Sequence, residues 1–173
     1  MEERKDLVTF KGNPVTLVGK QVKVGQEAPE FKLLDNSFKT VSLSRSKSKV
    51  KLVSVTFSLE TPICDMQTRT FDEAVGKCVK SAGYSVSMDL PFTLGRYAKE
   101  HPTLNLKLLT DYYDASFGTA YGLLVKENRL LARAVFVIGY DNTVRYAEYV
   151  KEITQAPNYE KALKALDVAA AEK

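Results

Sequence analysis

The chain has 173 residues, of which 45% are hydrophobic and 27% are charged, and its length fits a single domain over residues 1–173. The net charge of +4 is mild and no basic face with interleaved aromatic residues is evident, which argues against a nucleic-acid-binding protein. A single histidine, His101, argues against a zinc site of ordinary ligand count, so we expect neither a metal nor a cofactor.

The chain also lacks the sequence patterns of membrane insertion and export. No uncharged apolar run approaches the ~18 residues that a membrane span requires. The first residues, MEERKDLVTF, contain no apolar core of the signal-peptide type. We therefore expect a cytoplasmic protein without membrane contact, in which Cys64 and Cys78 are thiols rather than a structural disulfide.

The first third of the chain is typical of short strands separated by turns. Apolar runs at 7–10 and 15–18 flank a Gly-Asn-Pro turn and predict an N-terminal β-hairpin. A second short pair is predicted at 31–34 and 40–43. Residues 50–57 are dense in β-branched and apolar side chains, which predicts a central strand buried on both faces.

After this strand the hydrophobic period changes to three and four residues, which predicts an amphipathic helix. Its apolar side chains are Ile63, Met66, Phe71, Val75 and Cys78. Strands and helices then alternate: a strand near 83–88, a helix from 91, a strand near 106–110, a helical turn at 115–121, a strand hairpin at 134–138 and 144–150, and a helix at 158–170. This order predicts an α/β domain with a central mixed sheet flanked by helices.

Cys64 is unusual in its position, one turn into the predicted helix and shortly after a buried strand. Thr61 is a good N-cap and Pro62 suits the first helical position, so Cys64 takes the third position, near the free N–H groups of the first turn. A plain buried cysteine would be the alternative reading, since free cysteines behave as small hydrophobic residues.

A reactive cysteine at this position requires a nearby cation. A thiol with the ordinary pKa of about 8.5 is only a few per cent thiolate at neutral pH. Lowering a thiol pKa to about 6 takes roughly 3.4 kcal/mol, whereas a helix N-terminus supplies about 2 kcal/mol at best. The candidate cations are Arg69, five positions along the helix, and Arg133, which precedes the strand at 134–138.

Five segments match one family pattern in order and at matching separations: KGNPVTLVG at 11–19, SLETPIC at 58–64, SMDLPF at 87–92, SFGTAYG at 116–122 and LLARAVFV at 130–137. On these residues the chain resembles the bacterial thiol peroxidases, the atypical two-cysteine branch of the peroxiredoxins. The resemblance extends over nearly the whole chain. It implies a thioredoxin-like fold with an N-terminal hairpin, usually assembled as a homodimer.

The resemblance also implies the chemistry. Cys64 corresponds to the peroxidatic cysteine, and Thr61 and Arg133 correspond to the residues that bind the hydroperoxide, which selects Arg133 over Arg69. The thiolate would attack the distal peroxide oxygen and become a sulfenic acid. Thioredoxin or another thiol would then act as the reductant.

Two positions depart from the family pattern. Phe57 replaces a proline that walls the thiol from water, which predicts a distorted or partly blocked site. Ala98 stands where the family has its resolving cysteine. Cys78 cannot replace that cysteine, because 14 residues of continuous helix separate it from Cys64 by about 21 Å, and a disulfide requires Cα atoms within roughly 7 Å.

Three functions stay open at this point. The first is a one-cysteine peroxidase regenerated by an external thiol, the second a dimeric scaffold without activity, and the third a slow redox sensor. The presence of Thr61, Cys64 and Arg133 together favours the peroxidase, whereas Phe57 and Ala98 favour the scaffold. We expect Cys78 to be a core residue, with an intermolecular role as the alternative.

Overall fold

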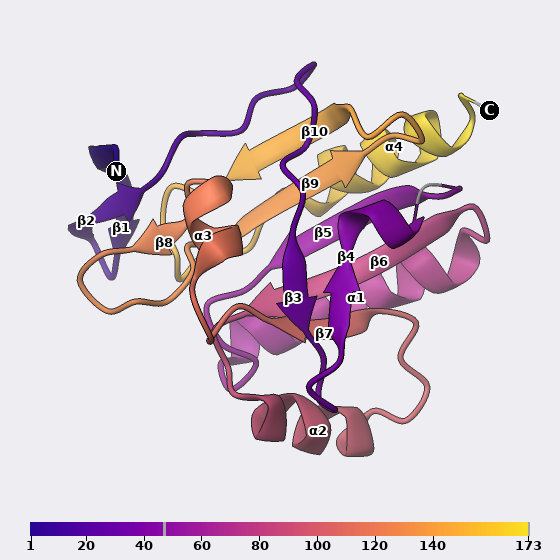
Figure 1. The fold of residues 1–173 in the computed structure, drawn as a ribbon, viewed down its shortest axis with the longest axis horizontal. Helices are drawn as coiled ribbons and strands as arrows, with labels where there is room; N and C mark the ends of the chain where they lie inside the picture. Colours follow the sequence, from indigo (N-terminus) through magenta and orange to yellow (C-terminus); the bar gives the residue numbers. More distant parts are fainter. Residues whose placement is uncertain (47, 173) are drawn as a thin grey trace.

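The computed structural model describes residues 1–46 and 48–172, and these form a seven-stranded mixed sheet together with a smaller three-stranded sheet (Figure 1). Across the large sheet the order is β10 (Val144–Tyr149), β9 (Ala134–Ile138), β5 (Val50–Val55), β6 (Ser81–Ser87), β7 (Lys107–Thr110), β3 (Lys32–Leu34) and β4 (Thr40–Ser42). Strands β5, β6 and β7 are parallel, and the other neighbours pair antiparallel. The predicted mixed sheet is therefore confirmed.

Helices cover both faces of this sheet. The long helices α1 (Pro62–Lys77) and α4 (Tyr159–Ala170) lie side by side behind it in Figure 1, the short helix α3 (Ser116–Ala120) lies in front, and α2 (Pro91–Glu100) lies below. A 3₁₀ helix, η1 (Leu43–Ser46), follows β4. None of the helices in the described ranges is long and apolar enough to cross a membrane.

The central strand β5 is buried on both faces, as its composition predicts. Val50 and Leu52 pack with α1 and α4, whereas Val53 and Val55 face the opposite core cluster, which includes Phe117 of α3. All six residues of β5 are buried. This double burial fixes the end of β5 rigidly, and the chain runs from that end into α1.

The N-terminal hairpin forms as predicted, from β1 (Glu3–Phe10) and β2 (Asn13–Val18), and a third short strand, β8 (Leu124–Val125), pairs with β2. The position of the turn differs from the prediction. Phe10 pairs with Asn13, so the turn residues are Lys11 and Gly12, both with positive φ, and Asn13 belongs to β2. A two-residue turn with two positive φ angles matches the right-handed twist of the strands.

The hairpin is attached to the segment after β10. The Thr9 N–H donates to Lys151 O at 2.7 Å, and the Ile153 N–H donates to Thr9 O at 2.9 Å. The Glu152 carboxylate accepts from the backbone N–H groups of Lys11 and Gly12, both at 3.0 Å. These bonds hold Phe10 where it lines a hollow together with Pro62 and Ile63 at the start of α1.

Candidate active site

The first turn of α1 is built as the sequence predicts. Thr61 is the N-cap in an extended conformation, and its Oγ1 accepts from the Cys64 N–H at 3.4 Å. The same hydroxyl donates to Ser58 O at 3.2 Å. Pro62 occupies the first helical position, where no N–H partner is needed. Cys64 is therefore at the third helical position.

The sulfur of Cys64 is fully buried but faces two hydrogen-bond donors. The Ser58 N–H and Arg133 Nη2 each lie 3.5 Å from Cys64 Sγ. A plain core cysteine does not need a guanidinium at this distance, and both donors are placed to form hydrogen bonds with the sulfur. The alternative reading of Cys64 as a small hydrophobic residue is therefore not supported by its surroundings.

Strand pairing brings Arg133 to this sulfur. β9 lies antiparallel to β5 with Ala134 opposite Val55, so the residue before β9 lies next to the segment that leads into α1. Arg133 is only 2% exposed, and its Nε donates to Ile153 O at 2.9 Å. The other candidate cation, Arg69, has a side chain that is 60% exposed and pairs with Asp65 at 3.1 Å.

A hollow of about 300 Å³ lies beside Thr61 and Arg133. Its lining is formed by Phe10, Lys11, Phe57, Thr61, Pro62, Ile63, Arg133, Ile153 and Thr154. Phe57 packs its ring on that of Phe10, with the ring centroids 4.9 Å apart. Phe57 thus forms a wall of the hollow together with Phe10 of the N-terminal hairpin, and whether it hinders access to the sulfur stays a prediction.

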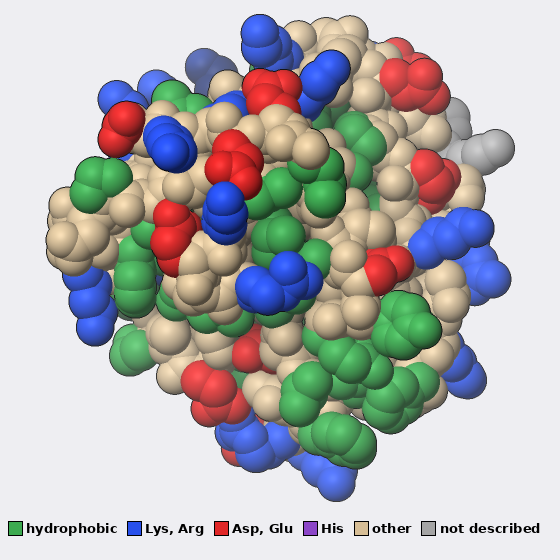
Figure 2. All heavy atoms as spheres, turned by 60° about the vertical axis from the view of Figure 1, so that its left-hand side comes forward, with side chains coloured by type: hydrophobic (Ala, Val, Ile, Leu, Met, Phe, Trp, Pro, Cys, Tyr) green, Lys and Arg blue, Asp and Glu red, His purple; other side chains and the backbone are tan. Residues whose placement is uncertain are grey.

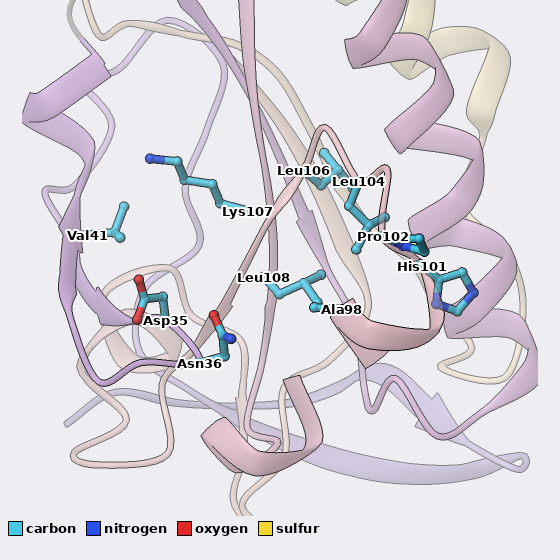
Figure 3. Close-up of a pocket in the computed structure, with 10 residues that line it drawn as sticks. All are labelled: Asp35, Asn36, Val41, Ala98, His101, Pro102, Leu104, Leu106, Lys107 and Leu108. Carbon is cyan, nitrogen blue, oxygen red and sulfur yellow. The ribbon is translucent and has the colours of Figure 1, made fainter. Parts of the chain in front are cut away.

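Ala98 lies on α2, half-buried against Leu59, Leu94, Tyr97 and Leu108. It borders a second hollow of about 300 Å³, which lies between α2, β7 and the turn that joins β3 to β4. Figure 3 shows Ala98 next to Leu108, across this hollow from Asp35 and Asn36 of the turn between β3 and β4.

Cys78 lies at the far end of α1. It caps the C-terminus of the helix and packs, half-buried, against the core cluster shared by α1 and α4. The helix is continuous from Pro62 to Lys77, so an intrachain disulfide between Cys64 and Cys78 would require α1 to unwind. Both cysteines are free thiols.

Polar contacts tie the start of α1 to α2. Tyr97 donates its hydroxyl to Asp65 Oδ1 at 2.6 Å, and Arg96 forms an ion pair with Glu60. Burial, reinforced by the hydrogen bond to Asp65, raises the pKa of Tyr97. The hydroxyl of Tyr97 therefore stays protonated over the physiological range.

The sequence prediction placed Phe71, Val75 and Cys78 correctly on the buried side of α1 but missed the polar members of that face. Met66 is half-exposed rather than part of the apolar stripe, and the buried side chains are those of Cys64, Gln67, Thr68, Phe71 and Val75. The spacing of three and four residues from Cys64 could have located Gln67, but polar side chains were not counted as inward-facing. Within the described ranges, no cluster of His, Cys, Asp and Glu could hold a metal ion.

Comparisons with known proteins agree with this geometry. A family model described as Redoxin matches residues 23–163. The thiol peroxidase of Bacillus subtilis is 48% identical over 158 residues, which cover 91% of this chain and 95% of the relative. The thiol peroxidase of Halalkalibacterium halodurans is 48% identical over 162 residues, covering 94% and 98% of the two chains.

Solved structures show the same fold. A peroxiredoxin-like protein from Aquifex aeolicus superposes with a TM-score of 0.88 at 33% identity, covering 96% of this chain and 99% of that one. A thiol peroxidase from Chromobacterium violaceum has a TM-score of 0.84 at 20% identity, which supports the thioredoxin-like peroxiredoxin fold alone. These matches extend over nearly the full length of relatives named thiol peroxidases, so they do not favour the scaffold or the sensor alternative. The chain belongs to the redoxin family and is a thiol peroxidase of the bacterial peroxiredoxin type.

Proposed function

We propose that Cys64 is the peroxidatic cysteine of this thiol peroxidase and that Thr61 and Arg133 bind the hydroperoxide. The observation that carries the proposal is the pair of donors, Arg133 Nη2 and the Ser58 N–H, at 3.5 Å from Cys64 Sγ. Both contacts favour a thiolate over a thiol.

In the first half-reaction the thiolate attacks the distal oxygen of the hydroperoxide. The Sγ–O bond forms as the O–O bond breaks, and the leaving oxygen takes a proton to become water or an alcohol. The sulfur is oxidised to a sulfenic acid. The guanidinium of Arg133 and the hydroxyl of Thr61 stabilise the negative charge that develops on the leaving oxygen.

In the second half-reaction an external thiol, such as that of thioredoxin, reduces the sulfenic acid. Its sulfur attacks Cys64 Sγ and water leaves, which produces a mixed disulfide. A second thiol then releases Cys64 and forms the disulfide product. The external thiol attacks Cys64 directly, because Ala98 provides no thiol and Cys78 is held at the other end of α1.

Stopped-flow mixing with one equivalent of hydroperoxide tests the proposal. We expect rapid loss of one thiol and a mass increase of about 16 Da on Cys64. Cys64→Ser should abolish the reaction, whereas the matched variant Cys78→Ser should retain it. Reaction of wild type at the rate of an ordinary free cysteine would contradict the proposal.

We further propose a cytoplasmic homodimer. Hydrophobic side chains gather low on the face shown in Figure 2. Three of the exposed hydrophobic residues are Phe38, Leu90 and Phe92. The ring centroids of Phe38 and Phe92 lie 5.9 Å apart, and Leu90 directly precedes α2. A second copy of the chain would cover this surface. Sedimentation of wild type as a dimer and of Phe92→Glu as a monomer would support the assembly, and a monomeric wild type would refute it.

A further inference from the structure

Asp89 lies in the loop between β6 and α2, two residues before α2 begins. Its carboxylate accepts three hydrogen bonds. Oδ1 accepts from Ser58 Oγ at 2.7 Å. Oδ2 accepts from the Leu59 N–H at 2.8 Å and from Ser87 Oγ at 2.9 Å. Ser58 and Leu59 belong to the segment that joins β5 to α1, so this one carboxylate ties that segment to the end of β6.

Ser58 supplies the backbone donor to the sulfur, since its N–H lies 3.5 Å from Cys64 Sγ. The other polar groups of Ser58 are held in place. Its hydroxyl donates to Asp89 and accepts from the Glu60 N–H at 3.2 Å. Its carbonyl oxygen accepts from the N–H and the hydroxyl of Thr61, at 3.1 and 3.2 Å. A loop residue keeps one backbone orientation only when such contacts offset the conformational entropy that is lost. Asp89 and Thr61 therefore fix the direction of the Ser58 N–H.

The carboxylate of Asp89 is itself anchored to the large sheet. Ser87 is the last residue of β6 and is only 1% exposed. Its hydroxyl donates to Asp89 Oδ2 and accepts from the Asp89 N–H at 3.2 Å. Strand β6 pairs in parallel with the whole of β5, the buried strand that leads toward α1. The position of the Ser58 N–H is therefore set by the rigid centre of the sheet.

We propose that Asp89 is a positioning residue for the peroxidase reaction, holding the Ser58 N–H against Cys64 Sγ through its anchor on β6. The inference rests on the role proposed above for Cys64 as the peroxidatic cysteine. Asp89 acts through the Ser58 peptide rather than through the guanidinium, so its contribution is separate from that of Arg133.

The charge of Asp89 and its positioning effect act on Cys64 in opposite directions. A negative charge near a thiol disfavours the thiolate, so removal of the charge alone would lower the pH of half-maximal alkylation of Cys64. Loss of a hydrogen-bond donor to the sulfur would raise this pH. The sign of the shift therefore shows which of the two effects dominates.

Two substitutions of Asp89 use this difference in sign. Asp89→Ala removes the charge and both acceptor atoms. We expect the alkylation midpoint to rise and the second-order rate constant with hydroperoxide to fall about 10- to 100-fold. Asp89→Asn removes the charge alone, because its amide oxygen can accept from Leu59 and Ser87 while its amide nitrogen donates to Ser58 Oγ. It should restore most of the rate without raising the midpoint. A midpoint that falls in both variants would show that Asp89 acts only through its charge, and would overturn the proposal.

A control on α1 separates positioning from loss of stability. Asp72 also accepts from two backbone N–H groups of a loop, those of Asn105 at 2.6 Å and Leu106 at 2.8 Å, but it lies about two turns beyond Cys64. Asp72→Ala should lower the unfolding midpoint in denaturant and leave the alkylation midpoint and the peroxide rate unchanged. If Asp89→Ala affects only stability, as Asp72→Ala is expected to, the proposal is wrong.

Ser58→Ala tests the same contact in case Asp89→Ala does not fold. It removes the hydroxyl held by Asp89 but keeps the backbone N–H and the negative charge. We expect a rise in the alkylation midpoint and a slower reaction, both smaller than in Asp89→Ala because the Leu59 contact persists. An unchanged midpoint and rate in Ser58→Ala would contradict the positioning role.

Combination with Arg133→Met separates failure of this inference from failure of the proposed function. Because Asp89 acts through a different donor, Asp89→Ala should slow the Arg133→Met protein by about the same factor as it slows wild type. No further slowing in that background would overturn the separate route through Ser58. If Arg133→Met slows the reaction and Asp89→Ala does not, the inference alone fails. If Cys64→Ser consumes hydroperoxide as fast as wild type, the proposed function fails first.

Discussion

At the scale of single residues, two hydrogen-bond donors converge on the sulfur of Cys64, and we expect the reactivity of the site to depend on them. The backbone N–H of Ser58 comes from the loop before α1, and Nη2 of Arg133 comes from the residue before β9. A helix N-terminus alone supplies at most about 2 kcal/mol toward a thiolate. We therefore expect the guanidinium to matter more than the helix N-terminus for the reactivity of Cys64.

Replacing Arg133 by methionine tests the contribution of the guanidinium to the reactivity of Cys64. We expect half-maximal alkylation of Cys64 by iodoacetamide to move to higher pH, and the peroxide rate constant to fall by about 10²- to 10³-fold. The fold should persist by circular dichroism. Arg69→Met serves as the control, because Arg69 pairs with Asp65 at the surface, and it should behave as wild type. An unchanged alkylation profile in Arg133→Met would exclude Arg133 as the cation.

The hydroxyl of Thr61 has a structural and a chemical role. Thr61→Val keeps the shape of the side chain but loses the N-cap, so we expect a loss of about 1 kcal/mol in the free energy of unfolding. The peroxide rate constant should fall as well, and Thr61→Ser should restore most of both. Thr70→Val, which removes a hydroxyl from the same helix away from the sulfur, is the matched control. Equal activity of Thr61→Val and wild type would rule out peroxide binding by this hydroxyl.

At the scale of elements, the N-terminal hairpin completes the wall of the active site. Phe10 of β1 packs on Phe57, and the hairpin is held in place through Glu152 after β10. Partial burial works to raise the pKa of Glu152, but hydrogen bonds from Thr9, Thr154 and Gly12 outweigh it and bring the pKa to about 2. The hairpin is therefore attached through a carboxylate that stays charged well into the acidic range.

This attachment predicts an acid dependence of stability. Because the folded pKa of Glu152 lies below the ordinary value of 4.5, its contribution is fully present above pH 4.5 and is lost as the pH falls toward about 2. Glu152→Gln should lack this contribution at neutral pH. Its free energy of unfolding should therefore fall less steeply than that of wild type as the pH is lowered from 4.5 toward about 2. Urea unfolding at several pH values measures the effect, with Glu2→Gln as an exposed control. Parallel curves for Glu152→Gln and wild type would contradict the prediction.

At the scale of the whole molecule, we expect reduction of Cys64 by an external thiol to require α1 and α2 to separate. Cys64 is fully buried, so a protein thiol reaches its sulfur only when the first turn of α1 opens. The contacts of Tyr97 with Asp65 and of Arg96 with Glu60 oppose this opening. We therefore expect these contacts to favour the closed arrangement seen here over an open arrangement in which a protein thiol could reach Cys64.

Introducing a thiol on α2 would report on this motion. After one equivalent of hydroperoxide, Ala98→Cys should lose about 2 Da relative to its reduced mass by forming an intrachain disulfide with Cys64. Wild type and Ala98→Ser should gain about 16 Da instead. Adding Tyr97→Phe should speed disulfide formation, since it removes the hydroxyl held by Asp65. A stable 16 Da adduct on Ala98→Cys would show that the two helices do not separate.

The chain as a whole, residues 1–173, is expected to behave as one domain. The two sheets share a core cluster that extends from Val8 of the hairpin to Val144 of β10. We predict one cooperative unfolding transition, with coincident curves from circular dichroism and tyrosine fluorescence. Separate transitions for the hairpin and the large sheet would contradict this.

Much of the local structure followed from the sequence, because its causes are local. The change of hydrophobic period marks the passage from β5 to α1, and Thr61 with Pro62 sets the start of the helix. The two-residue strand β8 was not predicted, because it is too short for any periodicity and exists only through its pairing with β2. Met66 was placed on the wrong face because the true inward stripe includes polar residues.

The sequence by itself determined that Cys64 stands at a helix N-terminus, since capping and helix period involve residues within one turn of each other. Only the tertiary structure decided which arginine meets the sulfur and what holds it there. Arg133 is 69 residues from Cys64 along the chain, and it arrives through the antiparallel pairing of β9 with β5. The contacts of Gln67 with that guanidinium and with the buried strand β5 could not be predicted from the sequence, because a hydrophobic pattern does not identify polar side chains that point inward.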